Sequence, residues 1–166
     1  MSPMANDPEL RETARAHLRQ GRAGALATLS TAERIEGFPF GSVVPYALDD
    51  RDQPLLLLAS IAQHTRNLQA DPRASLMVTQ PDVDGDPQSG WRATLIGEAE
   101  RLVTAADREA DVVVSQAELD DIVSRYAAIV PAAASYHETH NFHYWRLRPR
   151  RIRYIGGFGK IRWLEP

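Results

Sequence analysis

The sequence predicts a mainly β fold, in which an antiparallel sheet closes into a small β-barrel with helices at its flanks. Most apolar segments have the length of strands and are separated by short turns, and only a few helical segments lie between them. No Gly-x-Gly-x-x-Gly or Gly-x-x-x-x-Gly-Lys sequence follows a predicted strand, so the common nucleotide-binding loops have no support. We expect a single domain over residues 1–166, with an N-terminal helix in 1–22 and a helical insertion at 104–130.

Composition limits the classes of partner. Of the 166 residues, 43% are hydrophobic and 25% are charged, as in an ordinary soluble domain. The net charge of -3 gives no overall positive field for nucleic acid or anionic lipid, and the arginines of 146–153 are expected to form one exposed face of a strand. The chain has no cysteine, which excludes disulfides and thiol catalysis. With no secretion signal or membrane span expected, the prediction is a cytoplasmic protein without nucleic-acid or membrane partners.

The first part of the chain predicts a helix followed by strands. Apolar residues recur on one helical face from about Pro8 to Gln20, and Gly21 ends that helix. The segment Ala23 to Ser30 alternates so weakly that we expect a strand buried on both sides. Gly37 to Gly41 is expected to be a turn-rich bridge into the next strand.

Two apolar runs, 41–48 and 54–60, are joined by the turn residues 49–52 and predict a β-hairpin. The second run leads into a short helix whose first residues are polar: His64, Thr65, Arg66 and Asn67. A helix start offers unpaired backbone N–H groups and the positive end of the helix dipole, and here an imidazole, a hydroxyl and a guanidinium are added. The sequence therefore predicts a site for the phosphate group of a ligand.

The second half of the chain predicts long strands. Asp71-Pro72 ends the short helix, Ala74 to Gln80 forms a fourth strand, and Pro81 to Gly90 is an exposed loop. Trp91 to Val103 is a fifth strand, in which Gly97 marks a bulge or a close backbone approach.

The remaining segment predicts helices and then a return to strands. Two sequences of capping-box form, Thr104–Asp107 and Ser115–Glu118, predict one or two helices before Pro131. A further strand begins at Phe142 and is interrupted at Gly156, and Ile161 to Leu164 forms a short last strand.

Five segments in this order resemble the split β-barrels that bind flavin mononucleotide (FMN) and are related to pyridoxamine 5′-phosphate oxidase, and especially the haem-iron-utilisation (HugZ-type) proteins. Each segment alone is a weak signal, whereas five in family order and at family spacing are specific for the fold. The segments are Gly41–Tyr46, Ala59–Leu68, Asp71–Leu76, Arg92–Ala99 and Arg151–Gly159.

The resemblance implies a six-stranded antiparallel split barrel that forms a homodimer, with two FMN molecules between the subunits. It also implies a set of cofactor-binding residues: Ser42, Val43 and Val44 beside the isoalloxazine ring, Ser60, His64, Thr65 and Arg66 at the phosphate, Ala59 and Asn67 next to them, and Arg92 reaching over from the partner subunit. Relatives generally carry Arg and Lys at the positions of His64 and Thr65, so this chain departs from the family there. A deazaflavin in place of FMN stays open, as in some relatives.

Several of these residues also have plain structural interpretations. His64 by itself is more often a solvated helix residue, and the side chains of Arg66 and Arg73 could form salt bridges with Asp71 or Glu100. The three tryptophans are interpreted as anchors of the core or of a dimer interface: Trp91, Trp145 and Trp163.

A group of histidines, His137, His140 and His143, lies close to Glu138 in the sequence. No metal site is predicted, because the strand expected from Asn141 would point His143 away from the others, and neither a fourth ligand nor a cysteine supports the set.

The resemblance leaves three functions open, and the principal prediction is an FMN-dependent oxidoreductase that transfers hydride or electrons through flavin N5. No catalytic residue can be assigned to it. The first alternative is a haem-binding or haem-degrading protein, which would share the Gly156–Gly159 signature, although such relatives generally continue into a further C-terminal segment. The second alternative is a non-catalytic flavin-binding module. Pyridoxamine phosphate oxidation itself is disfavoured, because the Arg-x-His motif of that enzyme is replaced here by Gly157–Arg162.

Overall fold

The computed structural model describes residues 7–135, 141–157 and 160–166. Within them the chain forms three α-helices, two short 3-10 helices and nine strands. In chain order these are α1 (Pro8–Gln20), β1 (Ala23–Leu29), β2 (Pro39–Pro45), β3 (Ala47–Leu48), β4 (Pro54–Ala59), α2 (Gln63–Ala70), β5 (Arg73–Thr79), η1 (Pro87–Ser89), β6 (Trp91–Val103), β7 (Val112–Val113), α3 (Gln116–Ile129), η2 (Pro131–Ser135), β8 (Phe142–Gly156) and β9 (Ile161–Leu164).

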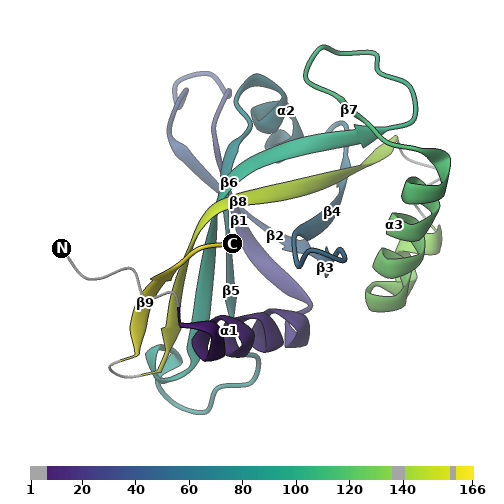
Figure 1. Cartoon of the computed structure of the whole chain (residues 1–166). Coiled ribbons are helices and arrows are strands. Elements are labelled where there is room, and N and C mark those ends of the chain that lie inside the picture. The colour runs from purple at the N-terminus through teal and green to yellow at the C-terminus, as the bar shows by residue number, and fades with distance from the viewer. Residues whose placement is uncertain (1–6, 136–140, 158–159) are drawn as a thin grey trace.

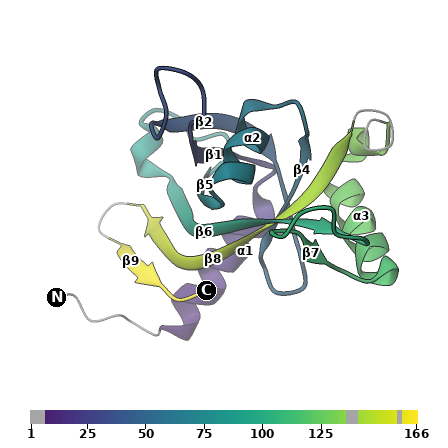
Figure 2. The ribbon, with the colours of Figure 1, turned by 90° about the horizontal axis from the view of Figure 1, so that it is seen from above.

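All the strands belong to one curled sheet (Figures 1 and 2). Its order is β2-β1-β5-β6-β8-β4-β3, with β7 beside β6 and β9 beside β8, and every pair except β6 with β7 is antiparallel. The prediction of a mainly β, antiparallel fold with flanking helices is confirmed. The count of six is not, because the described residues form nine strands, of which β3 and β7 have two residues each and carry no readable apolar pattern.

The first helix, α1, has the predicted bounds. The Asp7 carboxylate accepts hydrogen bonds from the backbone N–H groups of Glu9 and Leu10 and caps the helix start. Ala14 and Leu18 are buried against the sheet. Composition and periodicity are sufficient for such an element, because an amphipathic helix with a capping residue depends on local sequence.

The predicted hairpin of 41–48 and 54–60 is wrong in its pairing. β2 pairs along its whole length with β1, and only Ala47 and Leu48 pair with β4. The chain changes partner at Tyr46, whose ring is buried and whose hydroxyl donates to the carbonyl of Leu18. The fixed position of this aromatic ring, together with the missing N–H of Pro45, divides one apolar run into two strands.

Two further expectations about this region are corrected. β2 begins at Pro39, so part of the predicted turn-rich bridge belongs to the strand. β1 alternates between buried and exposed residues and is therefore covered on one face only, because its small alanines lie on the outer surface of the sheet.

The two longest strands, β6 and β8, pair over most of their length and carry a β-bulge. The register shifts between Ile96 and Gly97, and Arg150 is the residue of β8 left without a register partner. A Cβ atom on Gly97 would lie 1.9 Å from the carbonyl oxygen of Arg148. The predicted close backbone approach at Gly97 is confirmed.

The predicted helical insertion contains one helix. Ser115 caps α3 by accepting the N–H of Glu118, whereas Thr104–Asp107 begins no helix. Asp107 and Asp111 instead bind the guanidinium of Arg101, which is buried on β6, and β7 follows directly. An ion pair with the preceding strand thus overrides the local capping signal. No helix in the described part of the chain has the length and apolarity to cross a membrane, and the cytoplasmic location stays a prediction.

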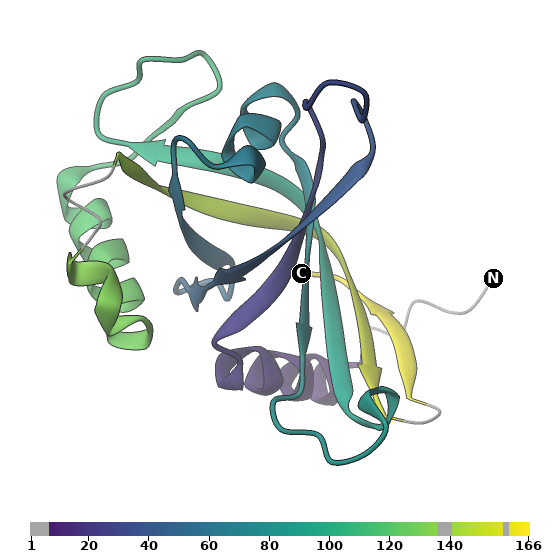
Figure 3. The same cartoon turned by 180° about the vertical axis from the view of Figure 1, so that it is seen from behind.

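The strand β4 separates two hydrophobic cores. Leu56 and Leu58 pack into the barrel with residues of β1, β5, β6 and α1. Leu55 and Leu57 pack on the other side, against α3. Figure 3 shows the resulting arrangement, with α3 at one side of the sheet and α1 beneath it.

Candidate functional site

The predicted phosphate site lies where β2 meets the first turn of α2, which we call the β2–α2 corner (Ser42, Ser60, His64 and Arg66). Figure 1 places α2 at one end of the sheet, beside the loop between β1 and β2. The Nδ1 atom of His64 lies 3.2 Å from the Oγ atom of Ser42. This hydrogen bond joins two sequence segments that were assigned to one cofactor site.

The imidazole of His64 is half-buried at this corner. Burial lowers its pKa below the ordinary value of 6.5, so the ring is neutral at pH 7. Because Nδ1 is engaged by Ser42, the nitrogen available to a ligand is Nε2. A hydrogen bond of this kind is how proteins fix the orientation of an imidazole that binds a metal or an anion.

The first turn of α2 has no side-chain cap. Ala62 occupies the N-cap position, and the N–H groups of Thr65 and Arg66 bond to its carbonyl oxygen. The N–H groups of Gln63 and His64 have no partner among the described residues. The Arg66 side chain is exposed and forms no ion pair with a described residue. The turn therefore offers backbone donors and a free cation to an anionic group.

Two of the predicted site residues, Thr65 and Asn67, have buried side chains that are 0% exposed. The Thr65 hydroxyl donates to the carbonyl of Ala59 at 2.7 Å. The Asn67 amide oxygen accepts from the backbone N–H and hydroxyl of Thr31, and its NH₂ group donates to Thr28. Both side chains hold α2 on the sheet, and their contact with a cofactor stays a prediction that would require these bonds to break.

The other predicted residues of this region are divided between two faces. Val43 is 83% exposed on the outer face of β2, whereas its neighbour Val44 is buried in the barrel. Ala59 is half-buried at the end of β4. The hydroxyl of Ser60 donates to the carbonyl of Asn141 at 2.6 Å and so ties the end of β4 to the start of β8.

Arg92 is separate from the corner within one chain. It lies near the start of β6, and its Nη1 atom donates to the carbonyls of Gln88 and Gly90. Figure 1 shows the 81–90 loop at the end of the sheet opposite α2. The expectation that this arginine reaches a cofactor held by the other subunit stays a prediction.

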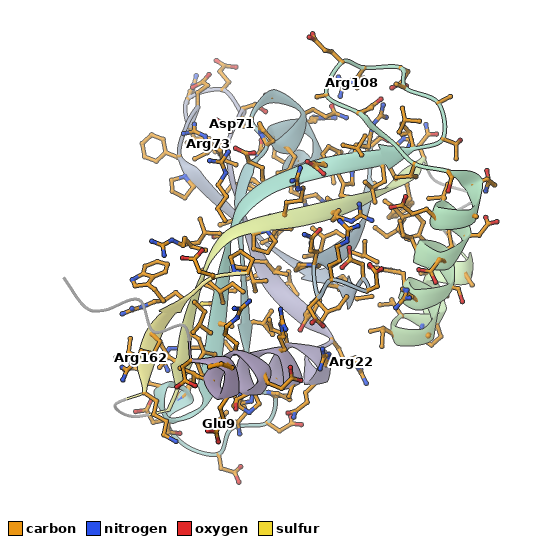
Figure 4. All side chains as sticks on the ribbon, viewed as in Figure 1. Glu9, Arg22, Asp71, Arg73, Arg108 and Arg162 are labelled. Carbon is orange, nitrogen blue, oxygen red and sulfur yellow. The ribbon has the colours of Figure 1, made fainter. Side chains whose placement is uncertain are left out.

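The predicted salt bridges and aromatic anchors can be placed. Arg73 pairs with Asp71, its Nε lying 2.9 Å from Oδ1, so the salt-bridge interpretation of Arg73 is confirmed (Figure 4). Trp91 and Trp145 are core residues, whereas Trp163 is partly exposed. The arginine face of β8 is not a free basic cluster, because these side chains pair with carboxylates: Arg146 with Asp49 and Glu118, Arg148 with Glu100, Arg150 with Glu98 and Arg151 with Glu165.

One cluster was missed by sequence reasoning. His17 of α1 stacks on Trp91 with ring centroids 4.7 Å apart, and its Nδ1 atom lies 2.8 Å from the hydroxyl of Tyr154. A signal was present, since His17 follows Ala14 by three residues and so falls on the buried stripe of the helix.

The described residues contain no group of three or more His, Asp or Glu side chains arranged to hold a metal ion. His143 lies on β8 opposite Leu58. The other members of the predicted histidine group, His137 and His140 with Glu138, lie outside the described residues.

Comparison with known proteins identifies the fold. The model of the CREG β-barrel family matches residues 7–166. Among solved structures, the haem-binding protein from Mycobacterium smegmatis has a TM-score of 0.77 and 35% sequence identity, covering 93% of this chain and 57% of that one. HutZ, a haem storage protein from Vibrio cholerae, has a TM-score of 0.61 at 22% identity, covering 86% and 89%, which is a likeness of fold alone.

A relative found by sequence is also named as a haem protein. The chloroplastic non-canonical haem oxygenase HOZ from Arabidopsis thaliana is 33% identical over 134 residues. The match covers 81% of this chain but 36% of the relative, so this chain spans about a third of that protein. The resemblance to split β-barrels, and to haem-utilisation proteins among them, is confirmed.

Proposed function

Because this chain belongs to the CREG β-barrel family, we propose that it is a haem-binding protein. One observation carries the proposal: two relatives with 33% and 35% identity are named as a haem oxygenase and a haem-binding protein. This gives the haem alternative more support than the flavin oxidoreductase that the sequence first suggested. Haem degradation would be a property of the longer relative and is not assigned to this chain.

The β2–α2 corner has groups that fit haem. His64 would offer a neutral Nε2 nitrogen to the haem iron, on a ring that is oriented by Ser42. The cation of Arg66 can pair with a propionate. Large apolar side chains are exposed at the same end of the molecule, Ile61 just before α2 (79% exposed) and Phe38 just before β2 (64% exposed), and these can cover a porphyrin face. Haem, when bound, supplies the redox-active iron.

Titration with haem tests this assignment. We expect a saturable Soret band with the wild-type protein, and affinity at least ~10-fold weaker for His64→Ala, because a nitrogen ligand is lost. Added imidazole should restore the Soret position of that variant. The matched control is His143→Ala, another half-buried histidine, and it should bind as the wild type does. Equal Soret titrations for His64→Ala and the wild type would remove His64 from the site.

A second candidate ligand is FMN, and the uncapped first turn of α2 favours it. The free N–H groups of Gln63 and His64, together with Arg66, could hold a phosphate. Loss of flavin fluorescence on titration would report binding, and Arg66→Gln should weaken it by about 1–3 kcal/mol as a charge-assisted hydrogen bond is lost. The same titration with a deazaflavin tests that cofactor. Reduction of bound flavin by a nicotinamide cofactor would distinguish an oxidoreductase from a non-catalytic module.

We also propose that the partner of this chain is a second copy of it. The outer face of the sheet carries a row of register partners that crosses six strands and is mostly apolar: Val43, Ala25, Met77, Thr94, Arg153 and Trp163. Arg153 lies over the Trp163 ring, 5.1 Å from its centroid. Exposed apolar surface of this extent, flanked by polar groups, is typical of an interface.

A further inference from the structure

A pocket of about 470 Å³ lies between α1 and the paired strands β8 and β9. It is at the end of the sheet opposite α2, so it is separate from the proposed haem corner (Figure 1). Its wall includes His17 and Tyr154 from the aromatic cluster described above. It also includes Lys160, which directly precedes β9, and Arg162, which lies on β9. None of these four residues has a role in the function proposed above.

The hydrogen bond between Tyr154 and His17 fixes the tautomer of the imidazole. The Tyr154 hydroxyl is buried, the residue being 1% exposed, and its partner among the described residues is Nδ1 of His17. A buried phenol donates its proton where an acceptor is available, so Nδ1 accepts and the neutral ring carries its own proton on Nε2. Stacking on Trp91 with an interplanar angle of 10° holds the ring in place. His17 therefore brings to the lining of the pocket a ring with an Nε2–H donor that no described residue accepts.

Two cations line the same pocket. Lys160 and Arg162 are exposed and form no ion pair with the described carboxylates, although Arg162 donates to its neighbouring carbonyl at Ile161. On the facing side, the Asp7 carboxylate is occupied by the cap of α1, which leaves Glu9 as the acid without a described partner. Figure 4 shows Glu9 and Arg162 at the same end of the molecule. Positive charge therefore prevails on the β8–β9 side, while α1 contributes the His17 donor as well as Glu9.

We propose that this pocket binds a small organic carboxylate with an apolar body. The carboxylate oxygens would accept from Nε2–H of His17 and pair with Lys160 and Arg162, since charge-assisted hydrogen bonds of this kind are the strong ones. The apolar body would lie against Leu10 and the Tyr154 ring, which also line the pocket. The volume of the pocket suits a small organic acid, and the proposal does not require haem to bind there.

Benzoate is the probe, and the NMR signals of the His17 ring are the readout. We expect saturable shifts with a dissociation constant on the order of 1 mM, as for a ligand of few atoms. The variant Lys160→Gln with Arg162→Gln changes exposed residues only and should weaken binding at least ~10-fold. Arg108→Gln is the matched control, since it removes an exposed arginine at the far end of the molecule (Figure 4), and it should leave the titration unchanged.

Three results would overturn the proposal: no saturable shift with benzoate, equal binding by the doubly substituted variant, or inorganic phosphate binding more tightly than benzoate. His17→Phe provides a second check, because it keeps an aromatic ring on Trp91 but removes the Nε2–H donor. The NMR signals of the Trp91 ring replace those of His17 as the readout for this variant and for a matched wild-type titration, and benzoate binding should be weaker in the variant. The haem titration of the β2–α2 corner does not involve these residues, so either proposal can fail without the other.

Discussion

At the residue scale, the β2–α2 corner is held by buried polar side chains. Asn67 connects α2 to β1 and to the segment after it through Thr28 and Thr31, and Gln63 donates a further bond to its amide oxygen at 2.8 Å. A buried amide is tolerated only when its donors and acceptors are paired, and here both ends are. The position of His64 relative to Ser42 therefore depends on a residue whose side chain bonds to neither of them.

Substitution of Asn67 tests this dependence. Asn67→Ala should lower the free energy of unfolding by about 2–4 kcal/mol, because it leaves a cavity and several unpaired groups in place of one satisfied amide. Urea denaturation followed by fluorescence measures it. Gln69→Ala, an exposed position on the same helix, should change stability by less than about 0.5 kcal/mol. Equal effects of the two substitutions would contradict the anchoring role of Asn67.

The histidines predict how stability varies with pH. Burial lowers the pKa of His17, His64 and His143 below 6.5, and for His143 the charge of Arg101 lowers it further. The unfolded chain therefore takes up protons near pH 6.5, before the folded chain does. The contribution of these groups to stability is complete above pH 6.5 and is lost as the pH falls from there toward the folded pKa values.

We expect a lower urea midpoint at about pH 5 than at about pH 7.5, and a smaller difference for His64→Gln, which has one titrating ring fewer. The buried carboxylate of Asp111 acts at a more acidic pH, because the Arg101 guanidinium holds the pKa of Asp111 far below 3.8. A midpoint that is constant between these two pH values would show that the histidines titrate alike in both states.

At the scale of elements, the bulge at Gly97 determines which side chains the longest strands present. Pro149 pairs with Gly97 and Arg151 with Ile96, so the residue between them is added to β8. Arg148 before the bulge, the extra residue Arg150, and Arg151 and Arg153 after it can then all lie on the outer face in spite of the change of parity. The ion pairs and the cation–π contact of that face follow from one glycine.

Gly97→Ala should therefore be strongly destabilising. Its Cβ would overlap backbone atoms of Arg148, which cannot move without breaking the β6–β8 pairing, and we expect a loss of at least about 2 kcal/mol in the free energy of unfolding. Gly41→Ala is the matched control, since nothing lies within 4 Å of the added Cβ and a strand favours alanine over glycine. Thermal and urea unfolding measure both, and a Gly97→Ala protein as stable as the wild type would refute the close approach.

At the scale of the whole molecule, the two faces of the curled sheet differ in what covers them. Its inner face is covered by its own curvature and by α1, and β4 is covered additionally by α3. The outer face keeps large apolar residues exposed, among them Met77, Ile96, Ile161 and Trp163. The outward residues of β1 are small or apolar, and Met77 of β5 and Ile96 of β6 are exposed among polar neighbours, which a solvated outer face does not require.

If a second copy of the chain covers the outer face, a charged side chain at the centre of that face should separate the two copies. Wild-type protein is expected to sediment as a dimer at micromolar concentration, and Met77→Lys as a monomer, because a buried unpaired ammonium is costly. The exposed position Val113 lies on β7, away from the row, and Val113→Lys should remain a dimer. A monomeric wild-type protein would contradict the proposed partner.

Much of the candidate site was predictable because its signals are local. The start of α2, the residues at its first turn and the strand containing Ser42 were all assigned from turn chemistry and apolar runs. The burial of Thr65 and Asn67 was not predictable from the sequence, since a hydroxyl or amide at a helix start can bond equally well to a ligand or to a neighbouring strand. The cluster around His17 also escaped, because Tyr154 is 137 positions away in the chain.

The sequence by itself determined the bounds of α1, β6 and most other elements, the antiparallel class and the close approach at Gly97, because periodicity, capping and glycine geometry act over a few residues. Only the tertiary structure decided that β2 pairs with β1, that Asp107 and Asp111 bind Arg101 instead of starting a helix, and which polar groups remain free for a ligand. Those outcomes depend on contacts between different elements, where burial and charge pairing outweigh local preference.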